Sequence, residues 1–318
     1  MGVFQNPHGK RSGNWKILAL SAMAALAVAG ISQTTHAALV ASDNAGNYSS
    51  GQWSGTQAYD QGTGFQSWYL SQSGSGPSGL FLASPSNNAG GPNSIVPPPP
   101  STSKNIWGVY ANNGNNANNS GFIQIYRSFT NSTKTGVGKL DPGQTFSIAL
   151  SSDGVSSLYA IGFNLQSTGE TSQYLFQMIF AGGNADMQIS DGSGSYTLSG
   201  VPFSAFGTSS VDQGGIVANV TIGSAVAGGG YNYSLTVTNA AGTTTLQTVS
   251  GRKTLPGQIN QFQVFDSNAG SNMYFNNIAV SGSPVVATPA PASFGLVLAG
   301  GIGLAGLAIR RRASVARP

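Results

Sequence analysis

The stretch Phe122-Ile-Gln-Ile-Tyr-Arg-Ser-Phe129 has the length and the aromatic and β-branched content of a single β-strand. Asp141-Pro142-Gly143-Gln144 follows as a turn signal. Three more runs of strand length come next: Phe146–Leu150, Leu158–Leu165 and Tyr174–Phe180. Because Ser152-Asp153-Gly154 and Gly182-Gly183-Asn184 separate these runs, the sequence predicts a series of short strands joined by turns.

The same pattern continues through the rest of the central region. Further strands are predicted at Asp186–Ile189, Tyr196–Leu198, Ile216–Ile222, Tyr231–Val237, Thr243–Val249, Ile259–Phe265 and Met273–Val280. Asn239-Ala-Ala-Gly242 is expected to join two of them as a hairpin. No long window shows the apolar stripe of a helix. Such a chain is predicted to be all-β, a β-sandwich and most simply a jelly roll.

The C-terminus contains three consecutive parts of different composition. Pro289-Ala290-Pro291 precedes an uncharged span from Phe294 to Ile309, and Arg310-Arg311-Arg312 opens a basic tail that runs to residue 318. As a helix the span rises about 24 Å, less than the ~30 Å of a hydrocarbon core, and arginines that reach the headgroups make up the difference. The arginines would stay on the cytoplasmic side, with the rest of the chain outside.

This order of parts resembles the PEP-CTERM sorting signal of Gram-negative bacteria that make exopolysaccharide. The motif here is a Pro-Ala-Pro variant, with alanine where the family most often has glutamate, and the resemblance covers residues 285–318. It implies transient anchoring in the inner membrane, removal of the tail by an exosortase-type transpeptidase, and delivery to the cell surface or to the extracellular matrix of a biofilm. A plain single-pass anchor is the alternative.

The N-terminus has the composition of a secretory signal peptide. Lys10, Arg11 and Lys16 precede an apolar stretch from 17 to 31, and small residues stand three and one before a possible cut. Cleavage by signal peptidase is predicted after Ala37, so residues 1–37 form the signal peptide. An uncleaved anchor is the alternative.

Most of the positive charge belongs to these two terminal segments. The whole chain has a net charge of +4, but the region between residues 38 and 289 has six basic and nine acidic residues, a net charge of −3. Nucleic-acid binding needs a basic face and is not expected here. The chain has no cysteine, so its stability must come from the core and the sheet ladders instead of disulfides.

Residues 43–103 differ in composition from the rest of the predicted sandwich, which spans residues 38–284. They are rich in glycine, serine and glutamine, have isolated aromatic residues, and end in four prolines, Pro97 to Pro100. Consecutive prolines cannot donate ladder hydrogen bonds. This region is interpreted as a loop or edge excursion of the sandwich, and a separate small domain followed by a stiff linker is the alternative.

The central region lacks the residues of common catalytic machinery. Both histidines, His8 and His36, lie in the predicted signal peptide, which excludes Ser–His–Asp and Cys–His sites and zinc sites built from His and Cys. Glu170 is the only glutamate of the chain, whereas glycoside hydrolysis needs two carboxylates across one bond. The protein is therefore predicted not to be an enzyme and not to need a cofactor.

A second resemblance concerns residues 105–148. Trp107-Gly-Val-Tyr110, Tyr126-Arg127-Ser128-Phe129 and the run from Leu140 to Phe146 look like a pattern that recurs in exported bacterial β-domains. Arg127 is expected to lie in a sheet face, to stack on Tyr126 or Trp107 and to pair with an acid. A structural salt bridge is the first interpretation, and a contact to a ligand is the second.

Three aspartates beside turns offer oxygen ligands for calcium: Asp186, Asp191 and Asp266. Aspartate in turns also accepts hydrogen bonds from its own backbone, and no EF-hand spacing is present. A bound calcium and a purely structural use of these carboxylates both remain open.

Two functions fit these observations. The first is a non-catalytic structural component of the cell surface or of the exopolysaccharide matrix. The second is a carbohydrate-binding sandwich that attaches to exopolysaccharide, with four candidate residues for stacking on sugar rings: Trp53, Trp68, Trp107 and Tyr110. The amides of residues 112–119 would supply hydrogen bonds. Burial of the tryptophans in the core is the alternative and would count against this surface.

Overall fold

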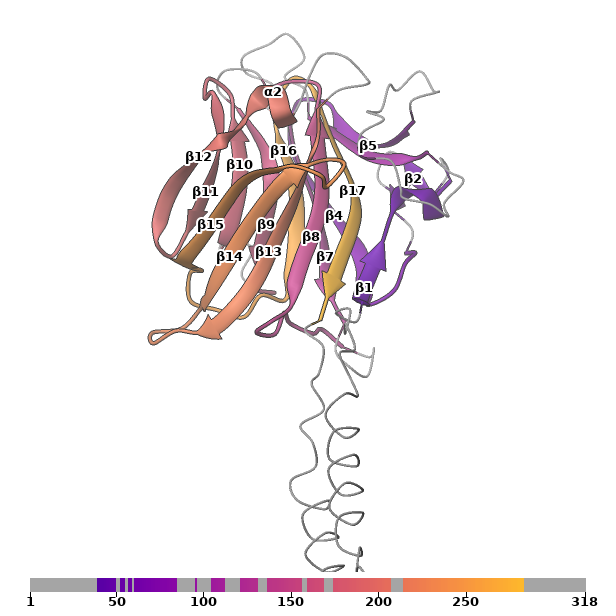
Figure 1. Cartoon of the computed structure of the whole chain (residues 1–318). Helices are drawn as coiled ribbons and strands as arrows, with labels where there is room; N and C mark the ends of the chain where they lie inside the picture. The colour runs from indigo at the N-terminus through magenta and orange to yellow at the C-terminus, as the bar shows by residue number, and fades with distance from the viewer. Residues whose placement is uncertain are drawn as a thin grey trace, which may run out of the picture. The chain divides into compact units, whose positions relative to one another are not determined.

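Figure 1 shows the protein as a computed structural model with two antiparallel β-sheets. No helix within the described part of the chain is long and apolar enough to cross a membrane. The predicted signal peptide and the predicted sorting signal lie outside that part. The structure describes residues 39–49, 52–54, 57–58, 60–84, 95, 104–111, 121–130, 136–155, 159–168, 174–206 and 214–282.

The larger sheet has eight strands in the order β15-β14-β13-β8-β17-β6-β5, with β1 also paired to β17. Its members are β1 (Leu39–Asp43), β5 (Ser78–Ala83), β6 (Ile106–Ala111), β8 (Thr145–Ser152), β13 (Ile216–Ala225), β14 (Tyr231–Asn239), β15 (Thr245–Lys253) and β17 (Asn272–Ser281). Strands β6 and β1 both pair with β17, β6 at Asn272 to Phe275 and β1 at Ile278 to Ser281.

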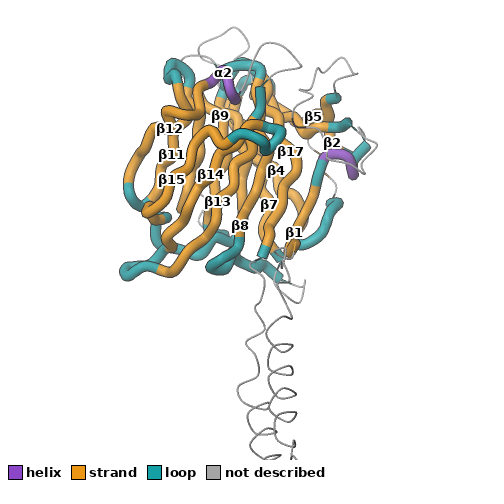
Figure 2. The backbone as a smooth tube through the Cα atoms, in the orientation of Figure 1, coloured by secondary structure: helices purple, strands orange, loops and turns teal. Residues whose placement is uncertain are grey.

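The second sheet has seven strands in the order β12-β11-β10-β9-β16-β7-β4. Its members are β4 (Phe65–Gly74), β7 (Gly121–Phe129), β9 (Ala160–Gln166), β10 (Tyr174–Ala181), β11 (Asp186–Asp191), β12 (Gly194–Pro202) and β16 (Gln261–Ser267). The remaining elements are short: a ribbon of β2 (Trp53–Ser54) and β3 (Gln57–Ala58), a 3₁₀ turn η1 (Ala45–Asn47) and α2 (Phe203–Phe206). Figure 2 shows that strands make up most of the described chain, so the all-β prediction is confirmed.

The Gly/Ser-rich region 43–103 contributes an edge strand to each sheet. Strand β4 ends the seven-stranded sheet beside β7, and β5 ends the eight-stranded sheet beside β6. An edge strand with one exposed face needs few apolar side chains, and only two of the ten residues of β4 are buried. The region thus supplies two edge strands, whose positions the sequence pattern does not predict.

The core between the sheets is aromatic at its centre. Phe146 of β8, Phe163 of β9 and Phe262 of β16 are completely buried. The ring centroid of Phe146 lies 5.3 Å from that of Phe262 and 5.8 Å from that of Phe163. Because β8 belongs to one sheet and the other two strands to the second, these contacts join the two layers into one core.

Strand β7 identifies the face of the seven-stranded sheet that points away from this core. Ile123, Ile125 and Phe129 are buried in the core, whereas Gln124 and Tyr126 between them are half-buried. Successive side chains of a strand point to opposite faces. Gln124 and Tyr126 therefore lie on the outer face.

The outer face of the eight-stranded sheet carries a second, smaller apolar cluster. Its buried members are Ala83, Ile95, Ile106, Ala149 and Tyr274. Asn276 Nδ2 donates to the carbonyl oxygen of Ile95 at 2.8 Å, which holds this residue against the sheet. Packing around Ile95 thus uses part of this outer face, and the outer face of the other sheet has a different, polar character.

Candidate functional site

The tryptophans predicted to stack on sugars lie in the core. Trp53 and Trp107 are 0% exposed and Trp68 is 8% exposed. Their rings pack against one another, with the centroid of Trp53 at 5.5 Å from Trp107 and 5.2 Å from Trp68. A ring that stacks on a sugar must present a face to solvent. These three residues therefore cannot take the role predicted for them.

Tyr110, the fourth predicted stacking residue, is half-buried on β6, with its ring centroid 6.1 Å from that of Phe81. The other predicted sites lie outside the described residues: the amides of 112–119, Ala37, the motif Pro289-Ala290-Pro291 and the cluster Arg310-Arg311-Arg312. The predicted residues thus form no binding surface within the described structure.

Arg127 forms the predicted pair with an acid, deep inside the sandwich. Its Nη1 donates to Asp43 Oδ2, and the two side chains are 2% and 0% exposed. Its Nε and Nη2 donate to the carbonyl oxygens of Gln66 and Gln61, both at 2.6 Å. Tyr48 donates its hydroxyl to the same Asp43 Oδ2 at 2.6 Å. This pair ties the N-terminal part of the sandwich to β7 and is structural.

The aromatic neighbours of Arg127 differ from the predicted ones. Its guanidinium carbon lies 5.1 Å from the ring centroid of Phe65 and 4.9 Å from that of Trp68. The predicted Tyr126 precedes Arg127 in the strand and so points to the opposite face of the sheet. The predicted Trp107 belongs to β6 in the other sheet. The prediction that Arg127 stacks on Tyr126 or Trp107 is therefore wrong.

The aspartates considered for calcium, Asp186, Asp191 and Asp266, do not gather into one site. Asp191 accepts from Arg252 Nε at 2.7 Å and from the hydroxyl of Tyr233. Asp266 is fully buried, accepts from two backbone N–H groups, and has its pKa raised to about 8 by burial. Among the described residues, no group of three or more acidic or histidine side chains is arranged to hold a metal ion.

A row of polar and aromatic side chains crosses the outer face of the seven-stranded sheet. The strand register aligns Tyr69, Tyr126, Gln263, Asn164 and Gln177, on β4, β7, β16, β9 and β10 in that order. Gln124 of β7 and Tyr174 of β10 lie beside the row on the same face. Five strands at a spacing of ~4.8 Å give the row a length of about 19 Å. We call these seven residues the tyrosine–amide face.

The tyrosines give this face flat apolar surface with polar tips. Tyr69 is 66% exposed, and its ring stacks on that of Tyr126 with a centroid distance of 5.4 Å and an interplanar angle of 29°. Burial raises the pKa of Tyr126, and burial followed by repulsion from Tyr126 raises the pKa of Tyr174. Both hydroxyl groups therefore keep their protons at neutral pH and can donate hydrogen bonds.

The amides form a connected chain of hydrogen bonds. Asn164 Nδ2 donates to Gln263 Oε1, and Gln263 Nε2 donates to Gln124 Oε1 at 2.5 Å. The hydroxyl of Tyr126 donates to the same Gln124 oxygen. At the other end Asn164 is 0% exposed, and its Oδ1 has no hydrogen-bond partner among the residues that the structure describes. A buried acceptor without a donor costs about 1–3 kcal/mol, so this atom is suited to a donor that arrives with a ligand.

The tyrosine–amide face offers binding groups and no reactive ones. Its seven side chains are phenols and amides, with no carboxylate, imidazole, thiol or amine among them. Phenols and amides supply hydrogen bonds and ring contacts, but they do not act as acid, base or nucleophile near neutral pH without activation. The arrangement fits reversible binding of a neutral, hydroxyl-rich molecule.

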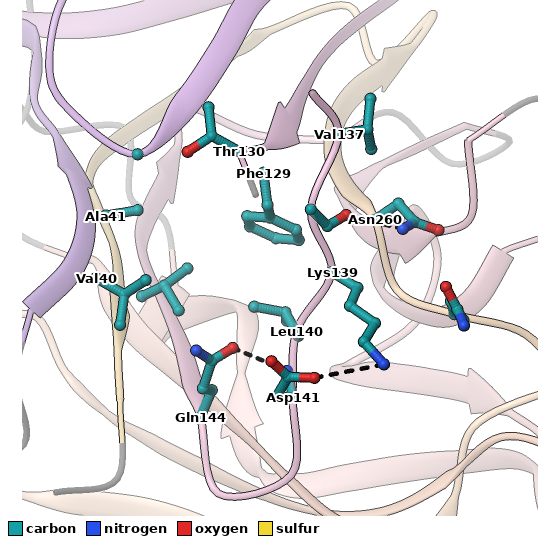
Figure 3. A pocket seen from close by; sticks show the side chains of 14 residues that line it. Val40, Ala41, Phe129, Thr130, Val137, Lys139, Leu140, Asp141, Gln144 and Asn260 are labelled. Atoms are coloured by element: carbon teal, nitrogen blue, oxygen red, sulfur yellow. Dashed lines mark hydrogen bonds and ion pairs between the residues drawn. The ribbon is translucent and has the colours of Figure 1, made fainter. Parts of the chain in front are cut away.

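A separate pocket of about 530 Å³ lies at one end of the sandwich, between the start of β1 and the turn before β8 (Figure 3). Its polar groups are bonded to one another. Asp141 pairs with Lys139 at 3.5 Å, the backbone N–H of Asp141 donates to Gln144 Oε1 at 2.8 Å, and Asn260 Nδ2 donates to the carbonyl oxygen of Gly138 at 2.8 Å. Phe129 at its base is only 3% exposed. The pocket is therefore a weaker candidate than the tyrosine–amide face.

No protein-family model matches the chain, and no curated protein matches it in sequence. Among solved structures, it is similar to the Emp47p carbohydrate recognition domain, with 10% identity, 80% of this chain and 100% of that chain covered, and a TM-score of 0.40. The cellulose induced protein Cip1 has 9% identity, coverage of 68% and 91%, and a TM-score of 0.37. The T. cruzi calreticulin globular domain has 12% identity, coverage of 76% and 95%, and a TM-score of 0.37. At such values these likenesses assign neither a family nor a ligand.

Sequence reasoning missed the tyrosine–amide face, although one signal for it was present. Gln124 and Tyr126 alternate with the apolar residues Ile123 and Ile125, which places two ligand-type side chains on the solvent side of a predicted strand. The amides beside them come from β16 and β9, and only the strand order of the sheet makes those strands neighbours.

Proposed function

We propose that this chain is a non-catalytic, exported protein that binds polysaccharide through the tyrosine–amide face. The observation that carries the proposal is the alignment of tyrosines and amides in one row across five strands, with a buried amide oxygen that lacks a donor in the described part of the chain. A structural component of the matrix without any ligand is the competing function, and it gives no reason for such a row.

Sugars fit this combination of groups because of their own two-sided chemistry. The C–H faces of a pyranose ring pack on the flat surface of a tyrosine, while its hydroxyl groups donate to and accept from amides. Tyr69 and Tyr126 supply adjoining ring surface, and Gln124 and Gln177 supply half-exposed amides. Because the face has no acid–base pair, the sugar is held and released unchanged.

The proposal includes the route by which the protein reaches polysaccharide outside the cell. Removal of residues 1–37 and of the PEP-CTERM-like tail would leave an acidic sandwich at the cell surface or in the matrix. The intact mass of protein recovered from the cell surface tests the route, because a retained C-terminal segment would indicate a plain anchor.

We propose a jelly roll for the detailed topology of the sandwich, since the chain changes sheet at β6–β7, β7–β8 and β8–β9.

Retention of the purified full-length protein on immobilised polysaccharides tests the binding function. We expect retention by at least one polymer and its loss in Tyr126→Ala, because this variant removes the ring that stacks on Tyr69 and adjoins the amides of the row.

Tyr110→Ala is the matched control, since Tyr110 is half-buried on the other sheet and should leave retention unchanged. Equal retention of wild type and Tyr126→Ala would contradict the proposed site. No retention on any polymer would support the purely structural role.

A further inference from the structure

We infer that the tyrosine–amide face takes an uncharged polysaccharide chain that runs across the strands, and that a hydroxyl group of this chain donates to Asn164 Oδ1. The inference rests on the proposed function, because it names the class of polymer and one contact at the same face. Three properties of the face lead to it: its length, its lack of charge and the polarity of its hydrogen-bond chain.

The length of the row selects a polymer over a single sugar. Tyr69 and Tyr126 lie on neighbouring strands at one end, and Tyr174 lies on β10, three strands beyond Tyr126. At ~4.8 Å per strand the distance from Tyr69 to Tyr174 is about 19 Å, which exceeds one sugar ring several times. Ring contacts at both ends with amides between them require a chain that lies perpendicular to the strands.

The absence of charge selects a neutral polymer. A uronic acid brings a carboxylate that must lose part of its hydration on binding, and a protein compensates this with arginine or lysine. None of the seven face residues is basic, and the nearest arginine along β7, Arg127, points into the core, where Asp43 already neutralises it. An acidic polysaccharide therefore gains nothing here that offsets its desolvation.

The hydrogen-bond chain shows where a sugar hydroxyl is needed. Every bond from Asn164 through Gln263 to Gln124 runs in one direction, so the chain begins at an unused acceptor, Asn164 Oδ1. A hydroxyl group both donates and accepts, and it can serve this acceptor while contacting the half-exposed Gln177 opposite. Gln177 is a half-exposed, flexible side chain beside Asn164, so a rotation of Gln177 opens the path to Asn164.

The first part of the test measures affinity by calorimetry for the full-length protein. The neutral probes are mixed-linkage β-glucan, xylan, dextran and their oligosaccharides of one to six sugars, and the acidic probes are alginate and polygalacturonate. We expect affinity for a neutral series to rise by about tenfold or more from one sugar to four or more, and at least about tenfold weaker binding of the acidic probes. Equal binding of acidic polymers, or of monosaccharide and oligosaccharide, would overturn the inference.

The second part tests the hydroxyl contact with Asn164→Leu. The variant removes the unpartnered acceptor together with one donor, so its unfolding temperature should stay close to that of wild type while its affinity falls about tenfold. Asn219→Leu, a half-buried asparagine on the outer side of β13, is the matched control and should change neither quantity. Unchanged affinity in Asn164→Leu would contradict the contact.

Folding defects and failure of the function have separate signatures. If Asn164→Leu unfolds, Gln124→Leu at the half-exposed end of the same hydrogen-bond chain replaces it, and full affinity in that variant would also contradict the inference. If acidic polymers bind as well as neutral ones and Tyr126→Ala still abolishes binding, the proposed function stands and this inference fails. If no polymer binds wild type, both fail.

Discussion

Two clusters of the same residue types stabilise two different parts of the sandwich. The Arg127 cluster consists of Arg127, Asp43 and Tyr48, and the Arg252 cluster consists of Arg252, Asp191 and Tyr233. In each, an arginine and a tyrosine hydroxyl donate to one buried aspartate. The arginines differ in exposure, since Arg127 is 2% exposed and Arg252 is 15% exposed. Comparing the two clusters therefore shows how burial of the arginine changes its contribution to stability when the residue types are the same.

The positions of the two clusters explain this difference. Arg127 on β7 is paired in register with Trp68 of β4, and its Nε and Nη2 also donate to the backbone carbonyls of Gln66 and Gln61. Arg252 lies on the edge strand β15, over the ring of Tyr196 at 5.2 Å, and bridges to the hairpin of β11 and β12 in the other sheet. Water can replace some of the hydrogen bonds that Arg252 donates, but not those of the buried Arg127. Loss of the arginine should therefore lower the free energy of unfolding more in the Arg127 cluster than in the Arg252 cluster.

The largest effect is expected for Arg127→Met. The variant keeps much of the apolar volume but leaves the Asp43 carboxylate buried without its cation. We expect the free energy of unfolding to fall by about 3–5 kcal/mol in urea titrations. A loss below about 1 kcal/mol would show that the N-terminal part of the sandwich does not depend on this pair.

Asp266→Asn should change the pH dependence of stability, because Asp266 is a buried aspartate served by backbone N–H groups instead of an arginine. Burial raises its pKa to about 8, so its favourable contribution is complete below the ordinary aspartate pKa and is lost as the pH rises towards 8. We expect wild type to lose several kcal/mol more than the variant between roughly pH 4 and pH 8, since each unit of pKa difference corresponds to about 1.4 kcal/mol. Parallel stability curves from urea titrations across this range would contradict the assignment.

Arg252→Met should have a smaller effect than Arg127→Met. Asp191 keeps two donors in this variant, the hydroxyl of Tyr233 and the backbone N–H of Ser193 at 2.6 Å. Because solvent also reaches this edge, we expect a loss of about 1–2 kcal/mol by the same titration. A loss equal to that of Arg127→Met would show that burial of the arginine does not decide the outcome.

The smallest effect is expected for Lys139→Ala. Lys139 and Asp141 form an exposed pair at 3.5 Å, with side chains 42% and 57% exposed. Such pairs contribute little, and the free energy of unfolding should change by less than about 0.5 kcal/mol. A larger loss would place the pocket of Figure 3 among the elements that hold the sandwich together.

Local pattern predicted the strands better than it predicted their partners. The alternation in residues 122–129 and the turn at Asp141-Pro142-Gly143-Gln144 place β7 and the start of β8 correctly. The acid that pairs with Arg127 lies 84 residues away, and no spacing in the sequence selects Asp43 over the other aspartates. Strand β4 escaped prediction because an edge strand keeps a loop-like composition.

The candidate site was harder to predict because the relevant signal depends on which sheet face remains polar. Tryptophans are attractive sugar-binding residues in a sequence, but their size also makes them the best filling for a sandwich core, where Trp53 and Trp107 lie. The tyrosine–amide face joins residues from 69 to 263, and its assembly follows from the strand order alone.

Hydroxyl-radical footprinting of the full-length protein, with and without a saturating neutral glucan that it binds, tests the tyrosine–amide face most directly. Tyr69 is the most exposed of its rings, and Tyr196 on β12, 41% exposed, serves as the internal reference. Polysaccharide binding at this face predicts that oxidation of Tyr69 and Tyr126 falls while oxidation of Tyr196 stays constant. Unchanged oxidation of Tyr69 and Tyr126 in the saturated complex would contradict it.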